Sequence, residues 1–396
     1  MKSGIEKLMS TTQQIIDGYD RFYLNDLKMR KRISFEHCSK PQLLFKEIID
    51  NSETPFIPKI QEKYNKVVEL DPFLIECQRT RSAPPGYRFP HPYQVELDRL
   101  RLNYSQLIKV FTKQLDDVAL SSSPFVYVET VDALQSLAEI LNESDIFAFD
   151  VHNHSFRSYQ GFICFMEIST DKEDYVIDCL KLREHLHILN KPFTNPNIFK
   201  VSLDSKDKLT WLQRDFGIYV LNLFDMKFLL NNLSLPNSLP FLANKFLEFS
   251  FKNIYLEFDF RKRPITSQEK LYLRSFSHFS LRVFFKLKGM VPKFGMDHLY
   301  QEIFEESRKL CLNTYEKPVS DDGYYTLFNE LKNHLTMNKI NKLKKLISWR
   351  DMTARLEDES RDYILPDELI QTLLQDIPVI ITFSIISNFL ERPRIS

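Results

Sequence analysis

Glycine is scarce in this chain. It occurs eight times in 396 residues, which is about a third of its ordinary share of roughly 7%. Loops that cradle phosphates use closely spaced glycines, because only a residue without a side chain lets the backbone approach the ligand so closely. A glycine-rich phosphate loop is therefore not expected, and nucleotide-binding proteins of that type are disfavoured.

An excess of one charge and paired cysteines are also missing. Lysine plus arginine and aspartate plus glutamate both number 53, so overall charge does not indicate a nucleic-acid binder, although this does not exclude a local basic groove. The five cysteines form no C-x-x-C pair, and we expect free thiols in a reducing compartment rather than a disulfide framework or a zinc site. They are Cys38, Cys77, Cys164, Cys179 and Cys311.

Long hydrophobic runs are absent as well. Met1–Ile15 lacks the apolar stretch of a secretory signal. The longest apolar tract, Ile377–Leu390, is shorter than the roughly 20 residues that span a bilayer, and it contains hydroxyl and amide side chains. We expect a soluble, intracellular protein.

Composition divides what is present into five parts. Prolines interrupt residues 40–123, which predicts an extended segment that wraps a neighbouring domain. Strand patterns precede helix patterns in 124–290, which favours one mixed sheet with helices on its faces. The expected parts are short N-terminal helices at 1–37 ending in the basic cluster 28–32, the wrapping segment at 40–123, an α/β domain at 124–290, a helical domain at 291–376 and a tail at 377–396.

The α/β part begins with a clear pattern of strands. Apolar runs at 146–149, 162–168 and 175–178 predict a meander of three strands. The spacing of leucines predicts a helix over Val131–Asn142 with Thr130 as its N-cap. Further strands are expected at 199–201 and 222–225, and further helices at 185–189, 209–215 ending at Gly217, 226–232, 238–247, 267–288, 297–315, 323–333 and 339–357, with 102–120 partly helical.

The stretch DIFAFDVHNHSFRSYQGFICFMEIST at 145–170 resembles the first motif of the DEDD 3'-5' exonucleases. Downstream, WLQRDFG, NLFD and FRKRP follow in the order of the exosome-associated 3'-5' exoribonucleases, the PM/Scl autoantigen type. YEKP, WRD, EDES and YILP then resemble an HRDC domain. The resemblance covers about 40–376, while the family's N-terminal helical domain and basic tail look shortened. It implies an RNase H-like DEDD exonuclease domain (α/β) followed by an all-α HRDC domain, a nuclear location, and RNA and exosome proteins as partners.

In the family that this chain resembles, four carboxylates hold two divalent ions and a tyrosine orients the attacking water. The ions activate the water and stabilise the leaving oxygen, and Mg²⁺ prefers oxygen ligands. The position of the acid in the second motif is found by counting back without gaps from Trp211, the tryptophan of WLQ. The resemblance then assigns Asp150 and Tyr272 as retained, and places His152, Lys206 and Phe276 where the family has acids.

These replacements change the charge of the expected site. Lys206 is a candidate to pair with Asp150 and fill the place of one ion, which leaves a sum of charges near zero. Two metals should then not bind, and no cofactor is expected. Rescue by Asp204 or Asp207 would restore a site for Mg²⁺, and Asp150 has an alternative role as a structural cap at a strand end.

Three functional hypotheses follow. The favoured one is a pseudo-exonuclease that binds RNA or exosome-linked proteins in nuclear RNA processing. The alternatives are an active metal-dependent 3'-5' exoribonuclease with an unusual site, and a protein-binding scaffold without RNA affinity. Basic residues expected to meet RNA phosphates, with solvated surface as the alternative, are Arg157, Arg261, Arg263, Arg274, Lys342 and Lys345.

Overall fold

The computed structural model describes residues 40–374, except 114, 116–118, 252–257, 291–295, 320–321 and 332–334. The expectations for the helices at 1–37, the basic cluster at 28–32 and the tail at 377–396 lie outside the described residues. No helix in the described part is long and apolar enough to cross a membrane. Four of the five cysteines are described, and all four are buried free thiols.

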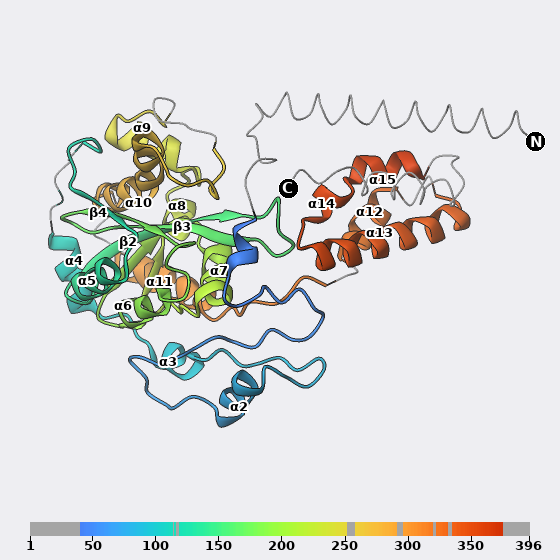
Figure 1. The fold of residues 1–396 in the computed structure, drawn as a ribbon. Coiled ribbons are helices and arrows are strands. Elements are labelled where there is room, and N and C mark those ends of the chain that lie inside the picture. The colour runs from blue at the N-terminus through green and yellow to red at the C-terminus, as the bar shows by residue number, and fades with distance from the viewer. Residues whose placement is uncertain are drawn as a thin grey trace, which may run out of the picture.

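A mixed sheet of six strands forms the centre of the larger part of the molecule (Figure 1). Strands β2, β3 and β4 form the expected antiparallel meander, whereas β1–β4, β2–β5 and β5–β6 pair in parallel. The spatial order is β1-β4-β3-β2-β5-β6. The strands are β1 (Phe125–Val128), β2 (Ile146–His154), β3 (Phe162–Ser169), β4 (Asp174–Asp178), β5 (Phe199–Ser202) and β6 (Leu223–Asp225).

Helices cover both faces of the sheet. Alternate residues of β2 point to opposite faces, so each face offers apolar side chains against which helices pack. Phe147 and Phe149 join one core, whereas Ile146 and Ala148 join the other. In Figure 1, α6 lies below the sheet and α9 above it. The first core includes α5 (Val131–Asn142), η3 (Leu186–Leu189), α6 (Asn190–Thr194) and α7 (Lys206–Phe216). The second core includes α4 (Tyr104–Thr112), α8 (Met226–Asn232), α9 (Leu239–Leu247) and α10 (Ser267–Lys288). Helix α11 (Met296–Cys311) lies beside β6.

Local caps fix the helices that carry the site. The Thr130 side chain accepts the amide of Ala133 at the start of α5, as predicted. Helix α7 ends at Gly217, whose φ of +63° suits glycine. Thr266 and Glu269 form a reciprocal capping box at the start of α10. These short-range bonds set the ends of α7 and α10, and thereby which side chains face the sheet.

Residues 40–123 contribute directly to the core of the sheet. Their proline-rich composition does not predict the helices α2 (Pro72–Thr80) and α3 (Gln94–Arg99), or the 3-10 turn η2 (Pro41–Leu44). Buried Leu74 and Leu97 from these helices belong to the same apolar cluster as β2 and α7. The segment therefore packs its own apolar side chains against one face of the α/β part.

The C-terminal helices have a core of their own. Helices α12 (Asp322–Leu331), α13 (Met337–Glu357), α14 (Arg361–Ile364) and α15 (Asp367–Leu373) lie beside the α/β part in Figure 1. Leu343, Leu346 and Ile370 are fully or almost fully buried within this cluster, and Tyr159 from the β2–β3 loop packs against it. The assignment of these helices to an HRDC domain stays a prediction.

Candidate functional site

The residues singled out by the first and third motifs meet on one face of the sheet. Asp150 and His152 point to the same side of β2, and Glu167 of β3 lies directly opposite Asp150. Helix α10 packs against both strands. It carries Tyr272 and Phe276 one turn apart, so both side chains lie on the same side of the helix.

A lysine ammonium binds the Asp150 carboxylate. The Nζ atom of Lys208 lies 2.7 Å from Oδ2 of Asp150 and 2.8 Å from the carbonyl oxygen of Leu203. The other carboxylate oxygen of Asp150 accepts the amide of Val151 at 2.7 Å. Both oxygens therefore have protein donors, and a cation already occupies the position next to Asp150.

The placement of this cation at Lys206 was wrong by two residues. Helix α7 begins at Lys206, whose side chain is exposed. Because residues of a helix advance by about 100° each, positions 206 and 208 point in nearly opposite directions. Only Lys208 faces Asp150, so Lys208 is the residue of the second motif that belongs to the site.

The two flanking aspartates point elsewhere. Asp204 has a φ of +53°, and its carboxylate accepts Lys227 Nζ at 2.7 Å and the Asn237 amide at 3.2 Å. Asp207 is exposed on the first turn of α7. Rescue of metal binding by Asp204 would require the loss of both its contacts.

His152 is paired with a carboxylate that sequence reasoning missed. Its Nε2 lies 2.6 Å from Oε1 of Glu167, which is fully buried. The second oxygen of Glu167 accepts the amide of Ser277 in α10 at 2.7 Å. Burial raises the pKa of the Glu167 carboxyl to about 7, the bond from His152 opposes this rise, and the charge of Asp150 adds to it. The buried carboxyl of Glu167 therefore has a partner on each of its two oxygens.

Phe276 belongs to an aromatic cluster. Its ring lies 5.2 Å from the ring of His152, 5.3 Å from that of Tyr272 and 5.6 Å from that of Phe251, measured between centroids. Phe260 adds a further ring 5.0 Å from His152. The contacts of Phe276 with His152 and Tyr272 are edge-to-face and the other two are tilted, at distances that are ordinary in aromatic cores. Phe276, which the resemblance places where the family has an acid, is thus part of apolar packing.

The residues present do not fit two divalent ions. Asp150 is bound by an ammonium, Phe276 has no ligand atom, and His152 is paired with Glu167. Asp150 and Lys208 cancel in charge, whereas two dications need several carboxylates around them. Within the described residues, no three His, Cys, Asp or Glu side chains group so as to hold a metal ion.

Comparison with known proteins shows what this arrangement derives from. A family model described as 3'-5' exonuclease matches residues 125–292. The exosome complex exonuclease RRP6 of Saccharomyces cerevisiae is 33% identical over 390 residues, covering 95% of this chain and 52% of that protein. The chain belongs to the exosome-associated exonuclease family. Exosome complex component 10 of Homo sapiens is 33% identical over 368 residues, covering 86% of this chain and 41% of that protein.

A solved structure supports the same membership. The catalytic core of RRP6 from Trypanosoma brucei superposes with a TM-score of 0.74 at 29% identity, covering 89% of this chain and 98% of that one. The predicted α/β exonuclease fold is therefore confirmed. The chain spans about half the length of the yeast relative, and less of the human one.

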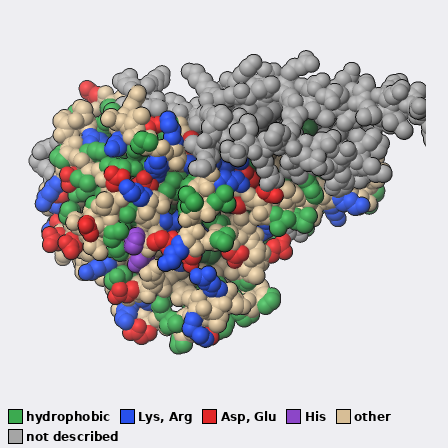
Figure 2. All heavy atoms as spheres, viewed as in Figure 1, with side chains coloured by type: hydrophobic (Ala, Val, Ile, Leu, Met, Phe, Trp, Pro, Cys, Tyr) green, Lys and Arg blue, Asp and Glu red, His purple; other side chains and the backbone are tan. Residues whose placement is uncertain are grey.

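In this family member, most basic residues expected at phosphates bind internal acids instead. Arg261 contacts Asp259 at 2.7 Å, and Arg263 contacts Asp178 at 2.6 Å. Figure 2 shows Lys and Arg mixed with Asp and Glu over the described face, rather than gathered in one basic stripe. These two arginines therefore support the structure from within.

Three of the four remaining candidates also make contacts within the protein. Arg274 is buried, with a bond to the carbonyl of Ser123 at 3.3 Å, and Lys342 donates to the carbonyl of Leu373. Arg157 binds a carboxylate of the helical part. Only Lys345 among the six expected residues is exposed. Sequence patterns show the charges but not the distant partners that neutralise them.

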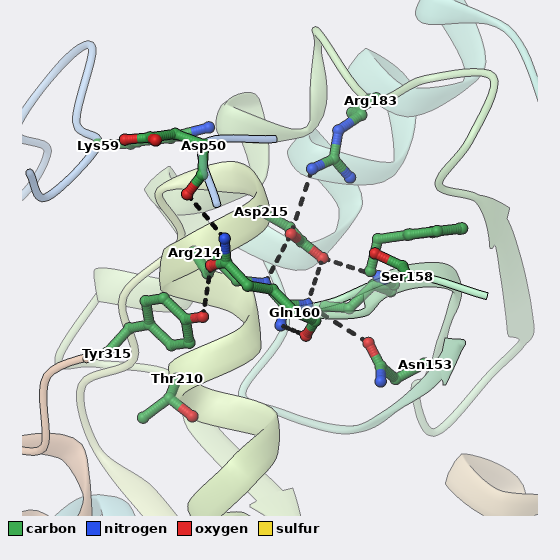
Figure 3. Close-up of polar contacts among 12 residues, drawn as sticks. Asp50, Lys59, Asn153, Ser158, Gln160, Arg183, Thr210, Arg214, Asp215 and Tyr315 are labelled. Atoms are coloured by element: carbon green, nitrogen blue, oxygen red, sulfur yellow. Dashed lines mark hydrogen bonds and ion pairs between the residues drawn. The ribbon is translucent and has the colours of Figure 1, made fainter. Parts of the chain in front are cut away.

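A second polar network that sequence reasoning missed lies around α7 (Figure 3). Asp215 accepts Arg214 Nε at 2.9 Å, Arg183 Nη2 at 3.2 Å and the amide of Ile163 at 2.7 Å. Arg214 also donates to the carbonyl of Gln160 at 2.6 Å. The network ties α7 to the β2–β3 loop, and the adjacent charges of the RD pair in WLQRDFG were its only signal.

Proposed function

We propose that this chain is a catalytically silent member of the exosome-associated exonuclease family, which binds RNA or exosome proteins in nuclear RNA processing without hydrolysing RNA. The single observation that carries the proposal is the ammonium of Lys208, 2.7 Å from the Asp150 carboxylate. RNA and exosome partners are inferred from the names and activities of the relatives.

Charge explains why the lysine opposes catalysis. A metal ion at Asp150 would meet a positive charge where the family mechanism needs another carboxylate, and like charges at contact distance repel strongly. The imidazole of the neighbouring His152 is bound to the carboxyl of Glu167. Phe276 adds no charge at all. Nothing in this arrangement offsets the repulsion between Lys208 and a dication.

The purified protein should therefore leave a 5'-labelled single-stranded RNA at full length in Mg²⁺ or Mn²⁺. Product lengths on a denaturing gel measure this. Asp150→Ala and the exposed Asp207→Ala form a matched pair of variants. Metal-dependent shortening that Asp150→Ala abolishes and Asp207→Ala spares would support the alternative of an active enzyme with an unusual site.

The RNA part of the proposal rests on a smaller surface than the sequence indicates. Five of the six expected basic residues make bonds within the protein, and Lys345 is exposed on α13. This observation favours the alternative of a protein-binding scaffold without RNA affinity. A titration of the protein with RNA distinguishes an RNA-binding protein from a scaffold without RNA affinity.

A labelled single strand should bind with roughly micromolar affinity at low salt and lose affinity as salt rises. Each phosphate contact on a single strand contributes about −0.7 to the slope of log K against log salt, because counterions are released. Lys345→Gln should weaken binding more than Lys309→Gln, whose lysine is exposed and paired on α11. Absence of binding at low salt, about 50 mM, would favour the scaffold.

A further inference from the structure

The loop between β2 and β3 is bound to the end of α13 through an ion pair. The guanidinium of Arg157 donates two bonds to the carboxylate of Glu359, at 2.8 Å and 2.7 Å. The two side chains are only 15% and 5% exposed. Lys40, from the N-terminal segment, approaches the same carboxylate at 2.7 Å. Glu359 thus collects positive charges from two segments distant in sequence.

Tyr159 makes the second contact of this loop with the helical part. Its hydroxyl donates to Oδ1 of Asp351 at 2.7 Å. The guanidinium groups of Arg355 and Arg361 lie 4.7 Å and 5.4 Å from its ring. Both arginines also pair with Asp351, at 2.7 Å and 2.6 Å. The ring is therefore held by charges on α13 and α14.

Asp358 adds a third anchor. Its Oδ1 atom accepts the hydroxyl of Ser158 and the amide of Tyr159, both at 3.0 Å, and the Asn51 amide at 3.0 Å. These contacts between the loop and α13–α14 are thus largely charged or polar. Polar interfaces within a chain commonly allow relative motion of their two sides, and salt screens the charges of such an interface once opening exposes them to solvent.

We propose that Ser158, Tyr159 and Arg157 on one side, and Asp351, Asp358 and Glu359 on the other, form an ionic latch. When closed, it fixes the helical part on the α/β part and keeps Arg157 from phosphates. Guanidinium binds carboxylate and phosphate with the same two-bond geometry, so an RNA phosphate can replace Glu359 at Arg157. This last step rests on the proposed function.

Opening is measured directly by the distance between two spin labels. Glu139→Cys on α5 and Ser348→Cys on α13 provide exposed sites in a Cys38→Ser background, and the other four cysteines are buried. We expect one narrow distance distribution at low salt, and a second population in Glu359→Gln that grows with salt. The control Glu306→Gln, which breaks an exposed pair with Lys309, should keep the single population.

A charge swap distinguishes loss of the ion pair from misfolding of the variant. In a Lys40→Gln background, which removes the second cation beside position 359, Arg157→Glu combined with Glu359→Arg should restore the single narrow distribution, whereas either of these two changes alone should not. A distance distribution in Glu359→Gln that stays unchanged at about 1 M salt, where the screening length is about 3 Å, overturns the latch. The latch is also overturned if the charge-swapped variant unfolds at the same temperature as the wild type but still shows the second population of distances.

RNA titration then tests the consequence for binding. Glu359→Gln should raise affinity several-fold at low salt, and Glu359→Gln with Arg157→Gln should abolish that gain. If Glu359→Gln opens the latch and RNA binds with unchanged affinity, the withholding of Arg157 is overturned. If the latch opens and neither form binds RNA, the RNA part of the proposed function fails while the latch stands.

Discussion

A variant with His152→Glu, Glu167→Gln, Lys208→Asp and Phe276→Asp should shorten a 5'-labelled RNA from its 3' end in Mg²⁺ or Mn²⁺. The expected gain over the unaltered protein is at least about a hundredfold, the effect commonly seen for a single electrostatic catalytic group. The reason is that acids at positions 152, 208 and 276 would again stand with Asp150, and Tyr272 is already on α10. Time courses on denaturing gels measure the gain.

Glu167→Gln is needed because of the partner of His152. Glu167 is fully buried and lies 2.6 Å from the imidazole, so Glu at position 152 would place two carboxyls against each other. Two carboxylates so close cannot both be ionised, and one would keep its proton. A glutamine at 167 can still accept the amide of Ser277 and donate its own NH₂ group to Glu at 152. The variant with Glu167 retained should therefore be less active.

A control with Lys206→Asp in place of Lys208→Asp isolates the role of the lysine. Lys206 is exposed, so the ammonium of Lys208 would stay on Asp150 and the control should remain inactive. Calorimetry with Mn²⁺ adds a readout besides hydrolysis. Equal activity of both combinations, or a folded Lys208→Asp combination that binds no Mn²⁺, would contradict the geometry assigned to Lys208.

The fold was predictable wherever local signals decide it. Helix α5 spans Val131–Asn142 as expected, because its leucine spacing and the Thr130 cap lie within the segment itself. The meander of β2, β3 and β4 follows from apolar runs separated by short turns. Strand β1 was missed, because four residues preceding a helix give little periodicity to detect.

The site was predictable only in part, because its decisive contacts depend on loops and on distant pairs. Counting back from Trp211 placed the cation at Lys206, whereas the direction of the side chains on α7 brings Lys208 to Asp150. Arg157 and Glu359 are 202 residues apart, and no local pattern links them. Glu167 stood out only as one acid within an apolar strand.

Asp215→Asn should destabilise the fold more than the other single changes discussed. The carboxylate of Asp215 neutralises Arg214 and Arg183 in a network that is almost fully buried. Removing one partner of a buried ion pair typically costs about 3–5 kcal/mol, because the remaining charge lacks compensation. Urea unfolding followed by circular dichroism measures the loss. Asp207→Asn, on the exposed side of the same helix, should stay within about 0.5 kcal/mol of the wild type.

The same carboxylate predicts a pH dependence. Burial alone would raise the pKa of Asp215, but Arg214, Arg183 and the Ile163 amide lower it to about 2. Because the pKa is lower in the folded than in the unfolded state, where it is about 3.9, this stabilisation is complete above about pH 5 and is lost as the pH falls toward 2. The difference in unfolding free energy between the wild type and Asp215→Asn should therefore shrink by about 2–3 kcal/mol across that window. A difference that stays constant as the pH falls would mean that Asp215 is not held ionised by the two arginines.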